Sequence, residues 1–176
     1  MLNRRELGSL ALLAFAAGAQ EAAAQSVTAS ARGDGQSEYL FWLSNGDRHD
    51  VRRAAEAVLS ELDAGPGDRS RLAGVHGRAA SVHQRRYTES AFADRIVKTR
   101  GARGGVRERA FQGVEGGFRF LPNFPDGEYA IAVFDTIFSQ DRDIHTEQLT
   151  LGRDPVRGNG WFLVDYYLGQ RPYYKY

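Results

Sequence analysis

The side chains whose types and spacing favour acid–base chemistry are two carboxylates and one imidazole in the last third of the chain: Asp135, Glu147 and His145. They lie on two segments, 129–138 and 144–151, in which apolar and polar residues alternate. Such alternation is typical of β-strands, in which every second side chain shares a face of the sheet. The candidate chemistry therefore depends on how these two strands pair.

The loop between the two strands sets their register. A five-residue loop over 139–143 places Asp135 opposite Glu147 and pairs apolar side chains beside them. The face of the first strand that turns to the core then carries Tyr129, Ile131, Val133, Asp135 and Ile137. Two carboxylates that face each other on a buried surface repel, and both burial and a like charge raise a carboxyl pKa.

A carboxyl group with a raised pKa can act as a general base or acid near neutral pH. In this interpretation Asp135 is the base, Glu147 raises its pKa, and His145 and Tyr129 are hydrogen-bond partners. The reaction class is proton transfer on a small apolar substrate, as in an isomerase or a lyase. The alternative is that the two carboxylates lie where the face meets solvent and pair with cations from the preceding segments, namely Arg95, Arg100 or Arg109.

Four aromatic side chains are candidates for binding a ligand. Phe120 and Phe124 lie on a proline-interrupted loop that leads to the first of the two strands, which Tyr129 begins. Trp161 begins the next apolar segment, 161–168. Large apolar side chains in such positions line a pocket or cap one end of the core, and both roles stay open.

The segment 161–168 can pair with its neighbour in two registers. One places Trp161 beside Leu151 and brings Asp165 next to Glu147 as a third acid. A slip by one residue removes that acid and turns a more apolar set to the same face, namely Phe162, Val164, Tyr166 and Leu168.

Apolar residues recur at helical spacing in three stretches before the strands, 47–64, 69–86 and 88–100. Asp47 and Thr88 are the expected N-caps of the first and third helices, and Gly101 ends the third. The second stretch predicts a short or irregular helix, because its two internal glycines each cost about 1 kcal/mol relative to Ala.

Two further segments complete the expected elements. A strand is predicted over 106–114, where Gly116 and Gly117 end it, and the apolar block 39–43 is a short strand or a lid that packs on the domain. Helices followed by strands predict an α+β fold in which N-terminal helices pack on a curved antiparallel sheet.

Composition narrows the possible functions. The 176 residues contain 42% hydrophobic and 26% charged residues and no cysteine, and the net charge is +1. These values predict one globular domain without disulfides or thiolate metal sites. We find no metal-ligand spacing, phosphate loop or nucleophile motif, so we expect no cofactor and no metal. Nucleic acid is not an expected partner, although the cationic cluster 98–109 is either an anion-binding surface or a solvated helix–strand junction.

The first 24 residues have the layout of a secretory signal peptide. Arg4 and Arg5 precede an apolar run over 10–17, and small residues follow at Ala22 to Ala24. The run is shorter than the roughly 20 residues of a membrane-spanning helix, so we expect no stable membrane span after its removal. The expected organisation is a signal peptide over 1–24, a flexible leader over 25–46 and a single α+β domain over 47–176. The expected location is periplasmic or secreted, by the general or the twin-arginine route.

The chain resembles a family of short exported bacterial proteins, domain of unknown function 4019. The most specific piece is PDGEYAIAVFDTIF, residues 125–138, and further matching positions are Arg95, Arg100, Arg109, Glu147, Trp161 and Tyr166. The second helical stretch departs from the family because it is rich in glycine and arginine, and the block 39–43 and the tail PYYKY have no counterpart. The resemblance implies a cystatin-like or nuclear-transport-factor-two-like cone, and it implies no activity or ligand.

The leading interpretation is an exported binding or interaction domain of the cell envelope, whose partner is a small apolar ligand or an envelope protein. The alternative is the acid–base isomerase or lyase. A closed sheet face favours the first, and a deep cavity in which Asp135, Glu147 and His145 converge favours the second.

Export predicts a specific mature end. Mass spectrometry of the protein from its native compartment should find a chain that begins at Gln25, because the small residues at 22–24 form the cleavage site. Recovery of a chain that retains residues 1–24 would contradict removal of a signal peptide.

Overall fold

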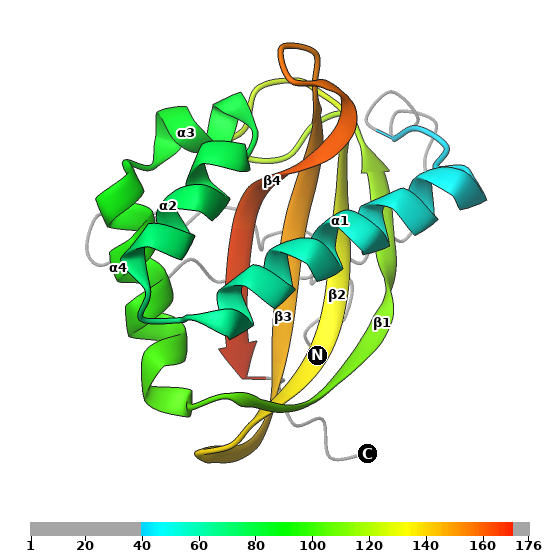
Figure 1. Cartoon of the computed structure of the whole chain (residues 1–176). Helices are drawn as coiled ribbons and strands as arrows, with labels where there is room; N and C mark the ends of the chain where they lie inside the picture. Colours follow the sequence, from blue (N-terminus) through cyan, green and yellow to red (C-terminus); the bar gives the residue numbers. More distant parts are fainter. Residues whose placement is uncertain (1–39, 171–176) are drawn as a thin grey trace, which may run out of the picture.

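The computed structural model describes residues 40–170, and Figure 1 shows helices packed on a curved sheet. The elements are, in chain order, α1 (Asn45–Ala64), α2 (Arg69–Arg78), α3 (Ser81–Arg86), α4 (Glu89–Arg100), the 3-10 turn η2 (Gly101–Arg103), β1 (Val106–Phe118), β2 (Tyr129–Phe138), β3 (Asp141–Asp154) and β4 (Gly158–Gln170). This order confirms the predicted α+β class and is compatible with the predicted cone. The predicted signal peptide, the leader up to residue 39 and the PYYKY tail lie outside the described residues.

Helix α1 crosses one face of the sheet (Figure 1) and begins with a capping box. The Ser44 hydroxyl accepts a hydrogen bond from the Asp47 N–H at 3.0 Å, and the Asp47 carboxylate accepts one from the Ser44 N–H at 3.2 Å. Ser44 is therefore the N-cap, and the prediction of Asp47 in that role is wrong, because Asp47 holds the third position of the box. The buried side of α1 is the predicted apolar stripe, with Val51, Ala55, Leu59 and Leu62.

The predicted irregular helix over 69–86 consists of two helices, α2 and α3, separated at Ala79 and Ala80. Both alanines are buried, and the Ala80 N–H donates to the Leu163 carbonyl of β4 at 2.8 Å. The break therefore docks this part of the chain on the sheet edge. Helix α4 starts after the N-cap Thr88 and ends at Gly101, as predicted.

The four strands form one antiparallel meander in the order β1-β2-β3-β4, but the β2–β3 register differs from the prediction. The turn between them pairs Phe138 with Asp141, so it contains two residues instead of five. Beyond a bulge, Asp135 pairs with Thr146 and Phe134 pairs with Glu147. The predicted pairing of Asp135 with Glu147 is therefore wrong by one residue.

This short turn is held by the backbone that follows η2. The Ser139 N–H donates to the Gly105 carbonyl at 2.8 Å, and the Gln140 N–H donates to the Arg103 carbonyl at 3.0 Å. Gly104 lies between these two acceptors with φ +75°, and a side chain there would clash with Ser139. Only glycine adopts this conformation at low cost beside so close a neighbour, so the turn and its register depend on it.

The changed register also reverses the faces of β2. The side chains buried beneath the helices are Ala130, Ala132, Phe134, Thr136 and Phe138, whereas the predicted core face, with Ile131, Val133, Asp135 and Ile137, is half-buried on the other side. Ala130 and Ala132 pack with the apolar side of α1 in one core. Their small size lets the helix approach the sheet, so the volume needed under α1 decides which face is buried.

A bulge divides β4, and neither predicted register is observed. On one side of the bulge Tyr166 and Leu168 share the face of the slipped set, but they pair with Leu149 and Glu147. On the other side Leu163 pairs with Leu151, whereas the first register paired it with Leu149. Asp165 pairs with Thr150, on the face opposite Glu147. The possible third acid is therefore absent from the buried face.

Strand β1 continues to Phe118, so the prediction that Gly116 and Gly117 end it is wrong. Both glycines have positive φ, +112° and +90°, and they form a bulge within the strand. A side chain at Gly117 would overlap the Phe41 carbonyl, and its absence lets the Phe41 N–H donate to the Gly117 carbonyl at 2.6 Å. Leu40 forms an isolated β-bridge with Phe118, so the described part of the block, from residue 40, lies along the end of β1 without forming a full strand.

Hydrogen-bond donors from the helices cover the open edge of β4. At its bulge, the Leu163 and Val164 carbonyls accept from the Ala80 N–H and from His83 Nδ1, the latter at 3.0 Å. Further along, the Tyr166 carbonyl accepts from Arg95 Nη2 at 2.6 Å. Unpaired edge groups promote association between sheets, and these three donors satisfy the carbonyls of the middle part of the β4 edge.

The covered edge predicts a specific loss of stability in acid. Burial lowers the pKa of His83 to about 4 from the ordinary 6.5, the Val164 carbonyl and Asp165 partly oppose this, and His76 and Arg95 add to it. Above pH 6.5 the ring is neutral in both states and contributes no pH dependence. Between pH 6.5 and 4 only the unfolded chain takes up the proton, so the free energy of unfolding falls by about 3 kcal/mol from this group alone.

We expect His83→Asn, which keeps a donor for the Val164 carbonyl, to reduce the slope of the free energy of unfolding against pH between pH 6.5 and 4. The reduction corresponds to at most one proton taken up on unfolding. Urea denaturation at several pH values measures this slope. Substitution of the exposed His49 by Asn serves as the control and should leave the slope unchanged. Equal slopes for the wild type and His83→Asn would show that His83 does not cause the loss of stability in acid.

Candidate functional site

Glu147 is the centre of a buried polar network, although not with the partners expected of a catalytic acid. Its Oε1 accepts hydrogen bonds from Arg100 Nη1 at 3.0 Å and from the Tyr166 hydroxyl at 2.6 Å. Its Oε2 accepts from the Thr136 hydroxyl at 2.5 Å and from Arg109, whose Nη2 lies 2.7 Å away. Both carboxylate oxygens are therefore saturated by donors from α4, β1, β2 and β4.

Asp63, in the last turn of α1, completes the network. Its carboxylate pairs with Arg100 and with Arg109, the latter at 2.6 Å. Two carboxylates thus balance two guanidinium groups. Arg100 and Glu147 are 2% and 0% exposed, whereas Asp63 is 27% exposed. Arg109 is 17% exposed, so solvent reaches the network at the side of Asp63 and Arg109.

Two groups of the network have shifted pKa values, and both shifts lead away from neutral pH. Burial, and then the charge of Glu147, raises the pKa of Tyr166 well above 10, so its hydroxyl stays a donor. For Arg109, burial lowers the pKa, but the hydrogen bond with Asp63 and the charge of Glu147 outweigh it and raise the pKa, so the guanidinium stays charged. Neither group exchanges a proton near pH 7, which suits a structural network better than acid–base chemistry.

The three predicted catalytic residues lie in three different surroundings. Asp135 is on the opposite face of β2 from the network. His145 is fully buried near the β2–β3 turn, where its Nε2 lies 2.8 Å from Asp141 Oδ2. Arg103 binds the same carboxylate at 2.6 Å. The structure does not bring Asp135, Glu147 and His145 together, and their catalytic role stays a prediction without a shared site.

The alternative interpretation, in which cations from the preceding segments meet the acids, describes Glu147 well. Arg100 and Arg109 bind it, and Arg95 binds Asp165 at 2.8 Å. Three arginines of the cationic cluster 98–109 pair with acids of the domain, namely Arg100, Arg103 and Arg109. These three side chains therefore do not form a purely solvated junction. Sequence reasoning missed Asp63 and the hydroxyl of Tyr166, because no local pattern marks either residue as part of a network.

The four predicted ligand-binding residues fall into two groups. Tyr129 and Phe124 pack with ring centroids 6.0 Å apart, and the Tyr129 hydroxyl donates to the Pro125 carbonyl at 2.7 Å. Burial, and then the charge of Asp126, raises the pKa of Tyr129. Phe120 is 47% exposed on the same loop, whereas Trp161 belongs to the main core beneath α1.

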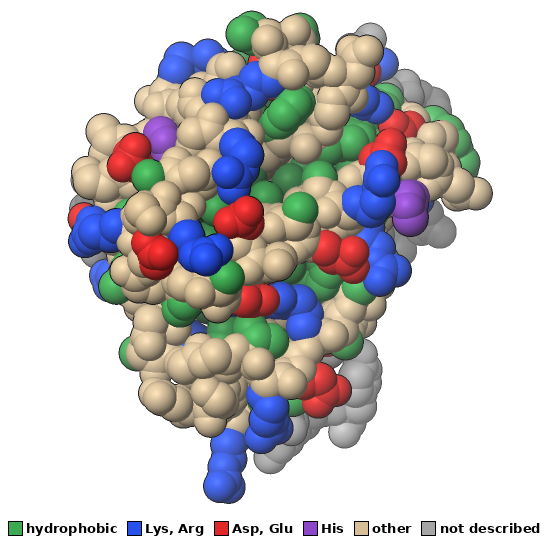
Figure 2. All heavy atoms as spheres, in the orientation of Figure 1, with side chains coloured by type: hydrophobic (Ala, Val, Ile, Leu, Met, Phe, Trp, Pro, Cys, Tyr) green, Lys and Arg blue, Asp and Glu red, His purple; other side chains and the backbone are tan. Residues whose placement is uncertain are grey.

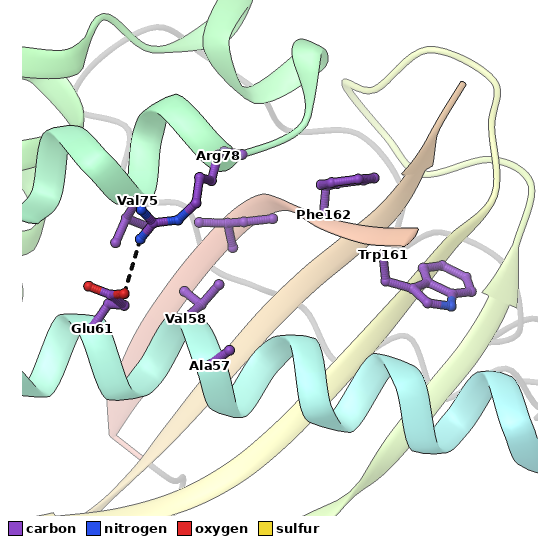
Figure 3. Close-up of a pocket in the computed structure, with 9 residues that line it drawn as sticks. Ala57, Val58, Glu61, Val75, Arg78, Trp161 and Phe162 are labelled. Atoms are coloured by element: carbon purple, nitrogen blue, oxygen red, sulfur yellow. Dashed lines mark ion pairs between the residues drawn. The ribbon is translucent and has the colours of Figure 1, made fainter. Parts of the chain in front are cut away.

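Trp161 also lines a pocket of about 120 Å³ between α1, α2 and the start of β4 (Figure 3). The walls are mostly apolar: Ala57 and Val58 from α1, Val75 and Ala79 from α2, and Phe162 and Leu163 from β4. At the rim, Arg78 Nη2 lies 3.1 Å from Glu61 Oε1, and this ion pair bridges the two helices.

Residues 40–170 contain no group of three or more His, Cys, Asp or Glu side chains that could hold a metal ion. None of their helices combines the length and the hydropathy that a membrane crossing needs.

Comparison with known families matches residues 54–166, more than half of the chain, to the family described as Protein of unknown function (DUF4019). This range contains every member of the buried network. Comparisons with curated proteins and with solved structures find no match.

The network predicts coupled effects of substitution. Glu147→Gln leaves Arg100 buried without its full countercharge, and Arg100→Met does the same to Glu147. We expect each to reduce the free energy of unfolding by about 3–5 kcal/mol. The double variant retains the balanced pair of Asp63 and Arg109 and should lose clearly less than the sum.

Chemical denaturation of the three variants measures this coupling. The exposed Glu108→Gln is the matched control and should stay within about 0.5 kcal/mol of the wild type. Additive losses in the double variant would show that the two residues do not depend on each other.

Proposed function

The chain belongs to the DUF4019 family, whose description assigns no function, and we propose that it is an exported domain that binds a protein of the cell envelope and is not an enzyme. The observation that carries this proposal is the closed inner face of the sheet. Helix α1 covers the apolar part of that face, and the saturated network fills its polar part.

The closed face argues against the isomerase or lyase. Such an enzyme needs a carboxylate within hydrogen-bond reach of its substrate. Glu147 is 0% exposed, and both of its oxygens already accept hydrogen bonds from the protein. Asp135 lies on the other face, so no substrate position touches both acids.

The pocket of Figure 3 is the feature that best supports binding of a protein. Its volume of about 120 Å³ is below the roughly 300 Å³ at which sites for small molecules begin. Apolar cavities of about 150 Å³ admit benzene, so this pocket accepts a group of about the size of one aliphatic side chain. A partner that inserts one apolar side chain would find buried walls from three elements.

The rim of the pocket adds polar groups around this apolar centre. Arg78 and Glu61 are 64% and 41% exposed and can hydrogen-bond to the backbone of a partner without losing their mutual contact. A central apolar anchor surrounded by polar groups is the usual arrangement at protein interfaces. The location in the envelope rests on the predicted signal peptide, so the partner is expected there.

Site-specific photo-crosslinking tests the proposal. A photoreactive residue at the exposed Ser60, one turn from Ala57 on α1, should give an adduct with an envelope protein in intact cells. Ala57→Phe places a large side chain at the pocket mouth and should reduce the adduct at least tenfold. Ala91→Phe changes an equally exposed alanine of α4 and should leave the adduct unchanged.

An adduct that survives Ala57→Phe would exclude this pocket as the contact. Absence of any adduct, while processed protein is present in the envelope fraction, would exclude the proposed partner.

A further inference from the structure

A second depression lies at the end of the molecule where α3 meets the β1–β2 connection. It has a volume of about 570 Å³, and its lining residues are Val82, Arg85 and Arg86 from α3 and Asn123 and Pro125 from the connection. This volume lies within the roughly 300–1,000 Å³ of sites for small molecules. Figure 2 shows basic side chains gathered over the same end of the protein.

The two arginines of this depression differ from most arginines of the domain. Within residues 40–170, Arg95, Arg100, Arg103 and Arg109 each bind a carboxylate, but Arg85 and Arg86 form no ion pair. Two cationic groups at one depression, with no carboxylate within ion-pair distance, favour an anionic ligand.

Arg86 is also held in place. Its guanidinium carbon lies 4.8 Å from the centroid of Phe124 and 5.5 Å from that of Tyr87. Stacking on an aromatic ring occupies the flat face of the guanidinium and leaves its N–H donors directed outward in its plane. The donors of Arg86 are therefore oriented before a ligand arrives.

The opposite wall is fixed by its own hydrogen bonds. The Phe124 N–H donates to the Leu121 carbonyl at 3.1 Å, and the Tyr129 hydroxyl holds the Pro125 carbonyl at 2.7 Å. Asn123 adopts φ +69°, a conformation that Asn tolerates better than most residues, and it lines the depression. A wall with these restraints loses little conformational entropy when a ligand binds.

We propose that this depression binds a small organic anion, with its carboxylate or phosphate on Arg85 and Arg86 and its apolar part against Val82 and Pro125. Asp126 is the acid beside the site: its charge raises the pKa of Tyr129, whereas the charge of Arg85 lowers it, so both groups lie near that hydroxyl. The charge of the two arginines exceeds that of Asp126, so the depression keeps a net positive charge. This site is separate from the pocket of Figure 3 and does not depend on the proposed partner protein.

Isotope-edited NMR titration of the mature protein at low salt tests the site with four probes: benzoate, acetate, inorganic phosphate and benzylammonium. We expect saturable shifts at α3 and residues 121–125 with benzoate, at least fivefold weaker binding of acetate, and none with benzylammonium. Inorganic phosphate tests whether negative charge alone is enough for binding at this site. If phosphate binds as tightly as benzoate, the proposal that the ligand is organic is wrong.

Arg85→Gln with Arg86→Gln should weaken benzoate binding at least tenfold. Arg107→Gln with Arg142→Gln removes the same charge from exposed, unpaired positions elsewhere and should leave binding unchanged. Equal losses in the two double variants would show a general charge effect and refute the site. Arg85→Gln alone preserves the stacking of Arg86 on Phe124 and should still weaken binding, and Ala57→Phe should not change it.

Discussion

The ion pair between Arg100 and Glu147 is the constraint on which the rest of this structure depends. Burial of either charge alone costs several kcal/mol, so the two must meet with suitable geometry and additional hydrogen bonds. Arg100 comes from the end of α4 and Glu147 from the middle of β3, and they lie 3.0 Å apart. Asp63 and Arg109 extend the pair to the end of α1 and to β1. Helix and sheet positions are thus fixed relative to one another by four charges.

The same network decides what the inner face of the sheet can do. Each hydrogen bond that stabilises Glu147 also occupies a lone pair that a substrate proton would need. Stability and reactivity therefore exclude each other at this position. Asp63, at 27% exposure, is the most exposed of the four charged groups, and both of its oxygens are bound to arginines. The two depressions described above lie at the margins instead, where helices meet the sheet edge or a loop.

Much of the architecture follows from local patterns in the sequence. Apolar periodicity predicts the helix stripe of Val51, Ala55, Leu59 and Leu62, and alternation predicts the meander. The β2–β3 register could not be predicted, because it depends on backbone contacts from residues 103–105 to a two-residue turn. Local sequence also favoured the branched residues of β2 as core, whereas α1 requires Ala130 and Ala132 beneath it. The predicted proximity of Asp135 and Glu147 is wrong for the same reason, because one residue of register moves Asp135 to the other face.

The two depressions at the margins have opposite character, and the topology explains why. The one between α1, α2 and β4 forms where two helices splay over buried strand residues, so its walls are apolar and its only charges are a mutual ion pair. The other forms where the short α3 ends against the β1–β2 connection, above a small second cluster that includes Phe118, Tyr129 and Val164. Arg86 there rests on aromatic rings, while the strand carboxylate next to α3, that of Asp154, accepts a hydrogen bond from the Ser81 N–H at the start of the helix. Among the arginines of residues 40–170 that stack on a ring, Arg95, Arg100 and Arg153 also bind a carboxylate, whereas Arg86 stacks without an ion pair.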